Sequence, residues 1–380
     1  MTPADFLVLS GHYSLVFILC LYGFHRLMNT VLAVRAKRLS GRDQKISKRF
    51  DTLPAVTVQA PIFNEKFVVK RLIDALAALD YPRERLQIQI IDDSTDETAR
   101  IAAECIAGYR NTGIDIVHFR RKTRAGFKAG ALQAAMASAK GEFIAIFDAD
   151  FVPPTDFLQA MINEFADPSV AMAQARWRYL NQERSLLTRV QAILLDAHFA
   201  VEQRARSGHG VFFNFNGTAG VWRRAAIDDA GGWRADTLTE DLDLSYRAQL
   251  RGWTFVYRDD VGAPSELPQT MRAFKSQQHR WAKGAIEVMR RVVRPVLRSN
   301  RSLHQKAEAL FHLTGNISYL VLLIDLAVFL PLSFLVRSHH GGALITGLDV
   351  ILFCFASVSH LIFFAAGQER AARSWFRTVM

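Results

Sequence analysis

The sequence predicts an α/β domain with a doubly wound, mostly parallel sheet, attached to helices that cross a membrane. Two observations carry this prediction. Between about residues 54 and 175, short apolar runs with strand character alternate with stretches of helical periodicity. Outside this region, three apolar runs are each about long enough to cross the hydrocarbon core as a helix. The chain has 380 residues, 50% of them hydrophobic, which fits a domain joined to a few spans.

The apolar run at residues 6–24 predicts the first span because it is almost free of charge. A cleaved signal peptide is the alternative, but the preceding stretch carries Asp5 and no Lys or Arg, whereas a signal peptide needs a positive start. Basic residues follow the run at once: Arg26, Arg35, Lys37, Arg38, Arg42, Lys45, Lys48 and Arg49. This asymmetry predicts a cytoplasmic domain after the span and an outward-facing N-terminus.

Two later apolar runs, 317–336 and 343–367, predict a helical hairpin. Its short outer loop is expected to carry Arg337, and a basic tail with Arg370, Arg373 and Arg377 is consistent with a return to the cytoplasm. Asp325 and Asp349 lie inside these runs, where acidic residues face a protein interior or a watery path, or pair with neighbours. Neither is assigned a function.

An amphipathic stretch at residues 271–298 precedes the hairpin. It is basic on one side and carries Val288, Met289, Val292, Val293 and Val296 on the other. This pattern is suited to a helix that lies in the membrane interface. The chain therefore divides into a first span with a basic linker, a cytoplasmic domain, a region of interfacial helices, and a hairpin with a short basic tail, at residues 1–50, 51–270, 271–310 and 311–380.

The formal net charge of +11 raises the question of nucleic-acid binding. The basic residues cluster beside apolar stretches and are not interleaved with base-stacking aromatics, so membrane lipid is the expected partner and nucleic acid is excluded. The three cysteines, Cys20, Cys105 and Cys354, lie far apart and predict neither a disulfide framework nor a metal–thiolate site.

Polar residues follow the predicted strands, at the sheet edge where ligands of parallel sheets bind: Asn64, Asp93 and Asp148. Asp93 belongs to the sequence IIDDSTDET at 90–98, in which Ser94 and Glu97 have the spacing of a capping box. If Ser94 caps the next helix, Asp93 stays free to accept hydrogen bonds from a base or a ribose.

The sequence FDAD places Asp148 and Asp150 just after an apolar run. Two hard oxygen ligands so close together suit Mg²⁺ or Mn²⁺ bridging a diphosphate. A lone pair of this kind is common by chance, and its alternative interpretation is a solvated acidic turn. The pair gains weight only in combination with other motifs.

Two more motifs come later in the chain. The sequence TLTEDLDL places Glu240 and Asp241 before a helix, where acids favour the helix dipole and Thr239 can cap. The sequence QQHRW contains Gln277, Arg280 and Trp281, which suit an interface anchor or a diphosphate and a sugar ring. Sugar transfer to a hydroxyl needs a carboxylate base and a metal that steadies the departing diphosphate, and Asp241 with the aspartate pair supplies these parts.

Taken together and in this order, the four motifs resemble the D, DxD, TED and QxxRW signatures of processive family-two glycosyltransferases, which include cellulose, hyaluronan and mannan synthases. The resemblance covers roughly residues 54 to 300. The phrases QAPIFNE, FNGTAGVWR, TEDLDLSYRAQLRGW and QQHRWAKG are most similar to the glucomannan mannosyltransferases and xyloglucan-backbone glucan synthases of plants, and bacterial relatives share them. The resemblance implies a GT-A-type fold.

Carried over by matching position, the resemblance implies a role for each motif residue. Asn64, Glu65 and Asp93 hold the nucleoside, Lys128 approaches the diphosphate, and Asp148 and Asp150 bind metal and donor. Asp241 is the base, with Glu240 beside it in the catalytic pair. Gly217 and Thr218 approach the acceptor, and the remaining motif closes the site over diphosphate and acceptor sugar through Gln277, Arg280 and Trp281.

The implied activity is transfer of glucose or mannose, from UDP-glucose or GDP-mannose, to a growing β-linked polysaccharide, with inversion. The implied location is the cell's inner (plasma) membrane, as a multi-pass protein with a cytoplasmic catalytic domain. Transfer of one sugar to diacylglycerol or ceramide is an open alternative, as is a non-catalytic membrane component. One departure stands out, because polymer-exporting relatives have more spans after the QxxRW region than the two seen here.

Overall fold

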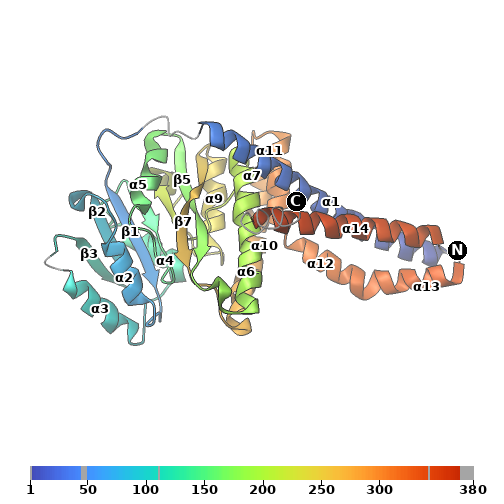
Figure 1. Ribbon diagram of the computed structural model, residues 1–380, viewed down its shortest axis with the longest axis horizontal. Helices are drawn as coiled ribbons and strands as arrows, with labels where there is room; N and C mark the ends of the chain where they lie inside the picture. Colours follow the sequence, from blue (N-terminus) through green and yellow to red (C-terminus); the bar gives the residue numbers. More distant parts are fainter. Residues whose placement is uncertain (1, 44–48, 110–111, 341–342, 369–380) are drawn as a thin grey trace, which may run out of the picture.

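The computed structural model describes residues 2–43, 49–109, 112–340 and 343–368 (Figure 1). Within them a seven-stranded sheet has the order β3-β2-β1-β4-β6-β5-β7. All neighbouring strands pair in parallel except β6, which is antiparallel to both β4 and β5. The strands are β1 Val56–Ile62, β2 Leu86–Asp92, β3 Asp115–Arg120, β4 Phe143–Ile146, β5 Val170–Tyr179, β6 Gly220–Arg223 and β7 Thr254–Ser265. The mostly parallel sheet predicted from the sequence is confirmed.

Helices cover both faces of this sheet, so even the polar side chains that alternate along β1 and β2 are buried, and they bond to one another: Thr57 donates to Gln87 Oε1 at 2.9 Å and Gln59 to Gln89 Oε1 at 3.0 Å. Strand β2 is buried along its whole length, as expected for a parallel strand enclosed on two sides. On one face the strands pack against α2 Val69–Ala77, α3 Thr98–Gly108 and α5 Phe157–Ile162. On the other face they pack against α4 Phe127–Met136, α8 Arg224–Asp229 and α9 Glu240–Leu250. The two cores are those of a doubly wound domain.

The remaining elements connect the sheet to the helices beside it. Short 3₁₀ turns occur at η1 Arg83–Arg85, η2 Asn163–Ala166 and η3 Gln182–Arg184. One long helical segment is made of α6 Leu186–Ala197, the π-helical turn η4 His198–Gln203 and α7 Arg204–Gly208. Two helices then follow the sheet, α10 Met271–Arg298 and α11 Leu303–Thr314.

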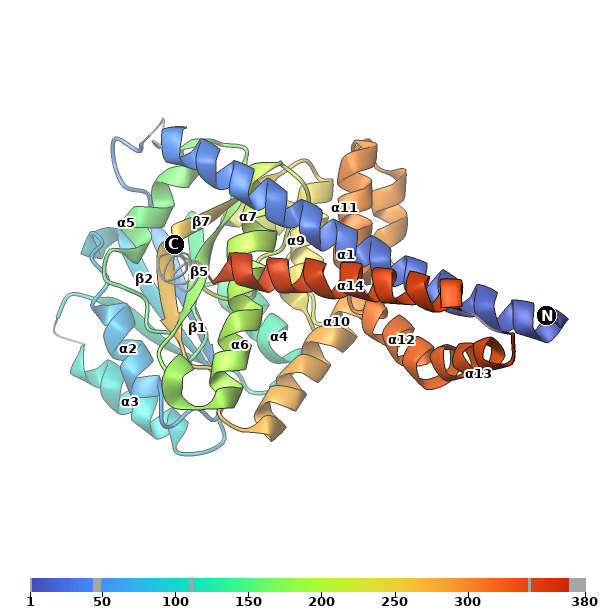
Figure 2. The same ribbon diagram turned by 45° about the vertical axis from the view of Figure 1, so that its right-hand side comes forward.

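Within the part of the chain that the structure describes, three helices are long and apolar enough to cross a membrane, at Pro3–Lys37, Ile317–His339 and Gly347–Gly367. They belong to α1 Pro3–Asp43, to α12 Ile317–Ile324 with η5 Asp325–Phe329 and α13 Leu330–His340, and to α14 Ala343–Gly367. They extend together from one side of the domain, with the N-terminus at the far end (Figure 1). The first helix is longer than residues 6–24 and continues along the domain (Figure 2). The three predicted spans are confirmed as candidates.

Four polar and charged residues inside the spans pair with one another: His12, Asp325, Arg337 and Asp349. His12 Nδ1 lies 2.8 Å from Asp325 Oδ1, and its Nε2 lies 3.4 Å from Asp349 Oδ1. Arg337 forms an ion pair with Asp349 and donates from Nη2 to Ser333 Oγ at 2.8 Å. The prediction that Arg337 lies in the outer loop is wrong, because α13 continues past it. The predicted basic residues Lys45, Lys48, Arg370, Arg373 and Arg377 lie outside the described residues.

Helix α10 has the predicted bounds but not the predicted surroundings. Its side chains Val288, Val292 and Val296 are buried against Leu242 of α9, Leu313 of α11 and their neighbours. The apolar face therefore packs inside the protein. The prediction that this face lies in the membrane interface is wrong, because an amphipathic pattern shows that a face is covered without showing what covers it.

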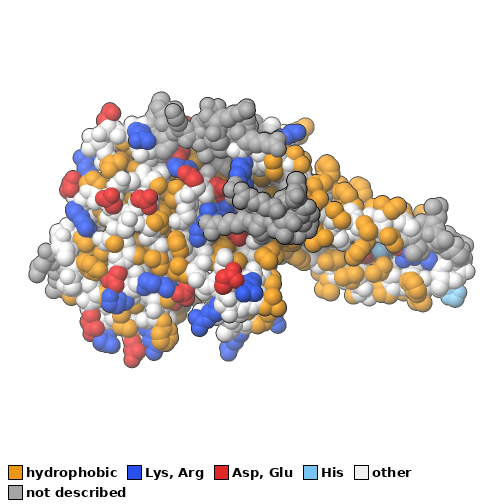
Figure 3. All heavy atoms as spheres, viewed as in Figure 1, with side chains coloured by type: hydrophobic (Ala, Val, Ile, Leu, Met, Phe, Trp, Pro, Cys, Tyr) orange, Lys and Arg blue, Asp and Glu red, His pale blue; other side chains and the backbone are white. Residues whose placement is uncertain are grey.

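An exposed apolar stripe lies instead on α6. Leu186, Val190, Ile193 and Leu194 recur at helical spacing and are exposed by 78, 44, 39 and 42%. The end of α14 packs against this segment, since a Cβ at Gly367 would lie 2.6 Å from Ala197 Cα. Figure 3 shows hydrophobic side chains covering the helices that extend from the domain, whereas charged side chains are scattered over the domain itself.

Candidate functional site

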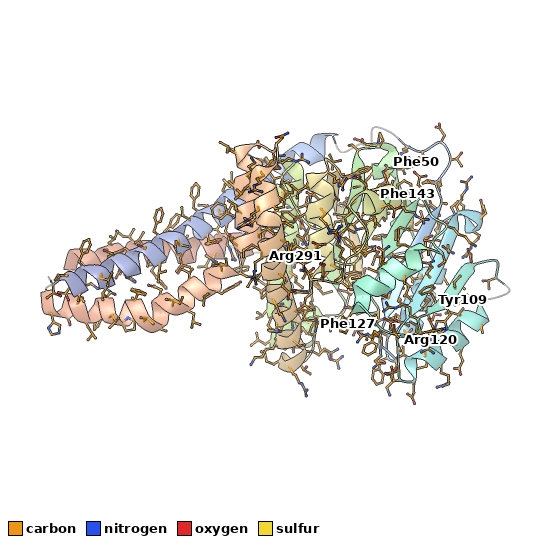
Figure 4. All side chains as sticks on the ribbon, turned by 180° about the vertical axis from the view of Figure 1, so that it is seen from behind. Phe50, Tyr109, Arg120, Phe127, Phe143 and Arg291 are labelled. Atoms are coloured by element: carbon orange, nitrogen blue, oxygen red, sulfur yellow. The ribbon has the colours of Figure 1, made fainter. Side chains whose placement is uncertain are left out.

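The parallel strands bring three of the predicted motifs to one edge of the sheet. Ile62 at the end of β1 is in register with Asp92 at the end of β2, and β4 runs beside β1 in the same direction. In Figure 4, Arg120 and Phe127 lie toward this edge, whereas Phe50 and Phe143 lie toward the opposite edge. Residues that follow these strands, from Asn64 to Asp150, are therefore neighbours in space although they are distant in the chain.

Asn64 and Ser94 join the loops after β1 and β2. The backbone of Asn64 has a φ of 57°, a left-handed conformation that asparagine tolerates well. Its N–H donates to Ser94 Oγ at 3.0 Å, and its Oδ1 accepts from Thr95 N at 2.9 Å. The predicted capping box at Ser94 is wrong, since α3 begins four residues later and Asp96 Oδ1 accepts from Thr98 N instead.

Asp93 is not free, as the sequence suggested, but is held by Arg121. The guanidinium donates from Nε to Asp93 Oδ1 at 3.0 Å and from Nη2 to Oδ2. The same side chain donates to the carbonyl oxygens of Ala125 and Phe127 at 2.8 and 3.1 Å. Asp93 thus fixes the loop that leads into α4. The basic sequence RRKTRAGFK is the signal that could have pointed to such a partner.

Lys128 is the centre on which the acidic residues converge. Its Nζ donates to Asp148 Oδ1 at 2.5 Å and to the carbonyl oxygen of Gly217 at 3.0 Å. Burial alone would lower the pKa of Lys128, but the negative charges of Asp148, Glu240 and Asp241 outweigh it and raise the pKa. The lysine is therefore a permanent cation between two pairs of carboxylates.

The loop that contains Gly217 and Thr218 lies between these two pairs. Gly217 has a φ of 81°, and a Cβ added there would lie 3.1 Å from Asp241 Oδ2 and 3.6 Å from Lys128 Nζ. Thr218 is buried, and its Oγ1 accepts from the N–H of Asp148 at 2.9 Å. The absence of a side chain at Gly217 leaves room above Asp241 for the approach of another molecule.

Asp150 and Glu65 are the other acids at this edge. Burial, together with the charge of Asp148, raises the pKa of Asp150 to about 7. Loss of hydration and the charges of Asp148 and Asp96 raise the pKa of Glu65. A divalent cation between carboxylates that repel each other in this way stabilises their ionised forms.

The side chains at this edge supply only some of the ligands that a magnesium or manganese ion needs. Among the described residues, no group of three or more His, Cys, Asp and Glu side chains is arranged to hold a metal. Asp148 and Asp150 are hard oxygen donors, and Mg²⁺ commonly takes one or two carboxylates while phosphate oxygens and water complete its shell. The pair therefore fits a metal that arrives with a diphosphate.

Glu240 and Asp241 begin helix α9. Thr239 occupies the capping position but its side chain makes no capping bond, so the predicted cap is not formed. Instead, Asp241 Oδ1 accepts from the N–H of Leu242 at 2.9 Å. Burial and the neighbouring charge of Glu240 raise the pKa of Asp241 to about 7, and burial raises the pKa of Glu240 as well. A carboxylate with such a pKa can accept a proton near neutral pH.

Helix α10 holds the chain just before this acidic pair. Glu287 Oε2 accepts from the N–H of Leu238 at 2.9 Å, and Arg291 forms an ion pair with Asp236. Gly284 lies so close to Thr239 that a Cβ there would be 2.6 Å from the threonine Cγ2. These contacts, which the sequence did not reveal, fix the position of the acidic pair (Figure 4 labels Arg291).

Gln277, Arg280 and Trp281 lie on the first turns of α10. Gln277 and Trp281 are spaced at i and i+4 and precede Gly284 on the same side of the helix, so they are directed along the side that faces α9. Arg280 donates to Ser276 Oγ at 3.1 Å within the helix. The three residues thus lie one to two helical turns before Gly284, the residue of α10 that packs against Thr239.

The comparison with known proteins agrees with this geometry. Residues 54–284 match the family described as "Glycosyltransferase like family 2". The chain is 44% identical over 293 residues to glucomannan 4-beta-mannosyltransferase 2 of Arabidopsis thaliana, covering 74% of this chain and 55% of that protein. It is 44% identical over 254 residues to glucomannan 4-beta-mannosyltransferase 1 of Oryza sativa subsp. japonica, covering 65% and 49%. The chain spans about half the length of these relatives.

Two solved structures share the fold. The mannosyltransferase PcManGT from Pyrobaculum calidifontis, in complex with GDP-Man and Mn²⁺, has a TM-score of 0.62 at 20% identity and covers 94% of this chain and 98% of that chain. S. aureus TarS 1–349, in complex with UDP-GlcNAc, has a TM-score of 0.52 at 15% identity, covering 84% and 92%. The GT-A-type fold that the motifs predicted is confirmed.

Proposed function

Because this chain belongs to glycosyltransferase family 2, we propose that it is an inverting hexosyltransferase that adds mannose from GDP-mannose to a growing β-linked polysaccharide. The observation that carries the proposal is the convergence of two carboxylate pairs on Lys128 and Gly217. The names of the plant relatives and of PcManGT favour mannose, and glucose from UDP-glucose is the alternative donor sugar.

The donor is proposed to lie along the carboxyl edge of the sheet. Asn64, Glu65 and Asp93 face the nucleoside, and Lys128 and Arg280 neutralise the diphosphate. Gln277 of α10 is proposed to bind the donor beside Arg280. Support comes from the edge position of the first three residues and from the raised pKa of Lys128, which keeps its charge at all physiological pH values. Asp93 would accept from the ribose or base while it holds Arg121.

Asp148 and Asp150 are the residues that would hold a divalent metal ion, Mg²⁺ or Mn²⁺. Such an ion supplies charge neutralisation for the departing diphosphate. The raised pKa of Asp150 supports this assignment, because a carboxylate that loses its proton reluctantly beside other acids is stabilised by a bound cation. Thr218 keeps Asp148 in place through the backbone of that residue.

Asp241 is proposed as the base and Glu240 as its catalytic neighbour. The acceptor oxygen forms a bond to the anomeric carbon from the side opposite the diphosphate, the carbon–diphosphate bond breaks, and the hydroxyl proton passes to Asp241. One such displacement inverts the configuration. The acceptor would approach over Gly217 and Thr218, with Trp281 as an apolar face for its terminal ring. A base with a pKa of about 7 is suited to this work at neutral pH.

We place residues 51–270 on the cytoplasmic face of the inner (plasma) membrane, in a multi-pass protein that also contacts membrane lipid. Support comes from the basic residues after the first span and from three helices able to cross a membrane. A protease added to sealed inside-out vesicles should cut the chain near Arg42. Protection of that segment would reverse the orientation.

The proposal is tested with membranes that contain the full chain, given labelled GDP-mannose or, separately, labelled UDP-glucose. We expect label from GDP-mannose in a polymer that β-mannanase degrades, and little in solvent-extractable lipid. If label enters polymer only from UDP-glucose, the donor is UDP-glucose and not GDP-mannose. Label in lipid would make the chain a glycolipid transferase, and label in neither fraction would contradict the proposed activity.

A further inference from the structure

The π-helical turn η4 lies between the candidate membrane helices and the loop that carries Gly217. It interrupts the long helix of α6 and α7, and π turns recur at functional sites because they insert an extra residue that turns side chains toward a new direction. Three of its polar side chains, His198, Glu202 and Gln203, are joined to residues outside the helix or to each other. Each contact can be assigned a donor and an acceptor.

On the domain side, η4 holds Asn216. Gln203 is fully buried and donates from Nε2 to Asn216 Oδ1 at 2.5 Å and to the carbonyl oxygen of Asn214 at 3.0 Å. The amide nitrogen of Asn216 therefore faces His198 Nε2, 2.9 Å away. The N–H of Asn216 donates to Gln174 Oε1 at 2.9 Å. Asn216 is thus fixed through its side chain by η4 and through its backbone by β5.

These contacts determine the state of His198. Because the Asn216 amide donates to Nε2, that nitrogen carries no proton, and the proton lies on Nδ1. Nδ1 donates to Glu202 Oε2 at 2.8 Å. Although burial opposes its charge, Arg206 and His198, together with Arg26 of α1, hold the pKa of Glu202 well below its usual range. The glutamate is a half-buried anion that orients the imidazole toward Asn216.

On the membrane side, the same segment packs between α1 and α14. Ala33 of α1, Phe363 of α14 and Val201 of η4 belong to one buried cluster, with Ala197 and Ala205 on either side of the turn. The guanidinium of Arg26 lies 5.2 Å from the ring centroid of Phe363. Small residues permit this close approach, since Gly208 would clash with Ala36 if it carried a Cβ. One side of η4 is therefore packed directly against the membrane helices.

Asn216 is followed by Gly217 and Thr218, which between them contact one residue of each carboxylate pair: Gly217 lies beside Asp241, and Thr218 bonds to Asp148. The carbonyl of Gly217 accepts from Lys128, and the hydroxyl of Thr218 accepts from the backbone of Asp148. Phe215 N donates to Ser245 Oγ, which donates to the carbonyl oxygen of Asp241. A displacement of Asn216 would thus change the space above Asp241. Misplacement by about 1 Å is enough to reduce a reaction rate by about 100-fold.

We propose that His198, Glu202 and Gln203 are positioning residues that couple the membrane helices α1 and α14 to the loop at residues 214–218, and so set the site for the acceptor. The inference rests on the proposed function for the role of this loop, whereas the mechanical coupling itself does not. It predicts that loosening either side of η4 impairs the use of acceptor more than the binding or cleavage of donor.

The test of the domain side uses Gln203→Leu, with Gln191→Leu as its matched control. Gln191 is also buried, lies on the same long helix, and donates to the carbonyl oxygen of Pro268 instead of to the loop. The full chain in lipid nanodiscs is assayed for acceptor KM, kcat and hydrolysis of the donor by water. We expect Gln203→Leu to raise the acceptor KM by about tenfold and to leave donor hydrolysis within about twofold, and Gln191→Leu to change neither.

The membrane side is tested with Phe363→Ala, and Phe353→Ala on the exposed side of α14 is its control. Hydrogen exchange of the segment 209–218 should become faster in Phe363→Ala and in Gln203→Leu but not in either control. This readout needs no turnover, so a chain that transfers no sugar would refute the proposed function while the coupling is still measured. Unchanged exchange, or equal losses of transfer and donor hydrolysis in Gln203→Leu, would overturn the inference.

Discussion

The two carboxylate pairs of the site have similar composition but are built in different ways. Asp148 and Asp150 come after strand β4, and the side chain of Asp148 is 34% exposed and paired with Lys128. Glu240 and Asp241 begin helix α9, and Asp241 lies under Gly217, where it accepts from a backbone N–H of its own helix. Asp148 is thus a half-exposed carboxylate held by a lysine, whereas Asp241 lies directly beneath the position where Gly217 has no side chain. The proposed roles of the two pairs, metal binding for the first and proton acceptance for the second, follow this difference in surroundings.

The largest effect is expected at the second pair. Asp241→Asn keeps the shape of the side chain but removes the proton acceptor, so transfer should fall by about 10²- to 10⁴-fold while donor binding is retained. Transfer and the Kd of GDP-mannose are measured side by side. Near-normal transfer in Asp241→Asn would show that Asp241 is not the base and only stabilises the first turn of α9.

Asp243→Asn is the matched control for this substitution. Asp243 lies on the same helix, is buried, and forms an ion pair with Arg247 at 2.8 Å. Losing one partner of a buried pair costs roughly 3–5 kcal/mol of unfolding free energy. We therefore expect a lower melting temperature, with the turnover of the folded enzyme largely kept. The two variants separate chemistry from stability on one helix.

The pH dependence of transfer sharpens the comparison. Asp150 and Asp241 each have a pKa raised to about 7, so below neutral pH both are largely protonated, and neither can bind metal or accept a proton. The rate should fall with decreasing pH, by about tenfold per pH unit for each carboxylate that must be ionised. Saturating Mn²⁺ keeps the first pair ionised, so only the dependence from Asp241 should remain. A profile that is flat, or equally steep at low and high Mn²⁺, would contradict these assignments.

The smallest effect is expected at Trp281, which belongs to α10 and to neither pair. Trp281→Ala should raise the KM of an oligosaccharide acceptor several-fold, on the scale of the roughly 1 kcal/mol that an aromatic contact provides beyond burial. Donor hydrolysis should fall much less, because water needs no apolar face. The assay compares chain elongation with release of free mannose. If Trp281→Ala weakens only the attachment of the chain to the membrane, Trp281 is a membrane anchor and does not bind the acceptor.

Strand direction made one part of the site predictable from the sequence. The ends of parallel strands meet at one edge, which predicts that Asn64, Asp93 and Asp148 lie at the same edge, and the sheet brings the ends of β1, β2 and β4 there. Contacts between side chains far apart in the chain could not be predicted in this way. Arg121 holds Asp93 from 28 residues away, and this pairing depends on how the loop before α4 folds back.

The two amphipathic helices show the same limit. Both α6 and α10 have an apolar face by their spacing, and only the structure shows which is covered. Val288 and Val292 of α10 are buried by α9 and α11, whereas Leu186 and Val190 of α6 stay exposed beside the membrane helices. The periodicity of one helix contains no information on the neighbours that the whole fold supplies. Likewise, Ser94 had the spacing of a cap but bonds to Asn64 instead.

The central claim is that the two pairs do different work in one site, and metal binding tests it most directly. Mn²⁺ is titrated into the full chain with GDP present, and free Mn²⁺ is followed by electron paramagnetic resonance. We predict that Asp241→Asn binds Mn²⁺ as the unsubstituted chain does, while Asp150→Asn binds it at least about tenfold more weakly. Equal binding in Asp150→Asn and the unsubstituted chain, or an equal loss in both variants, would contradict the account.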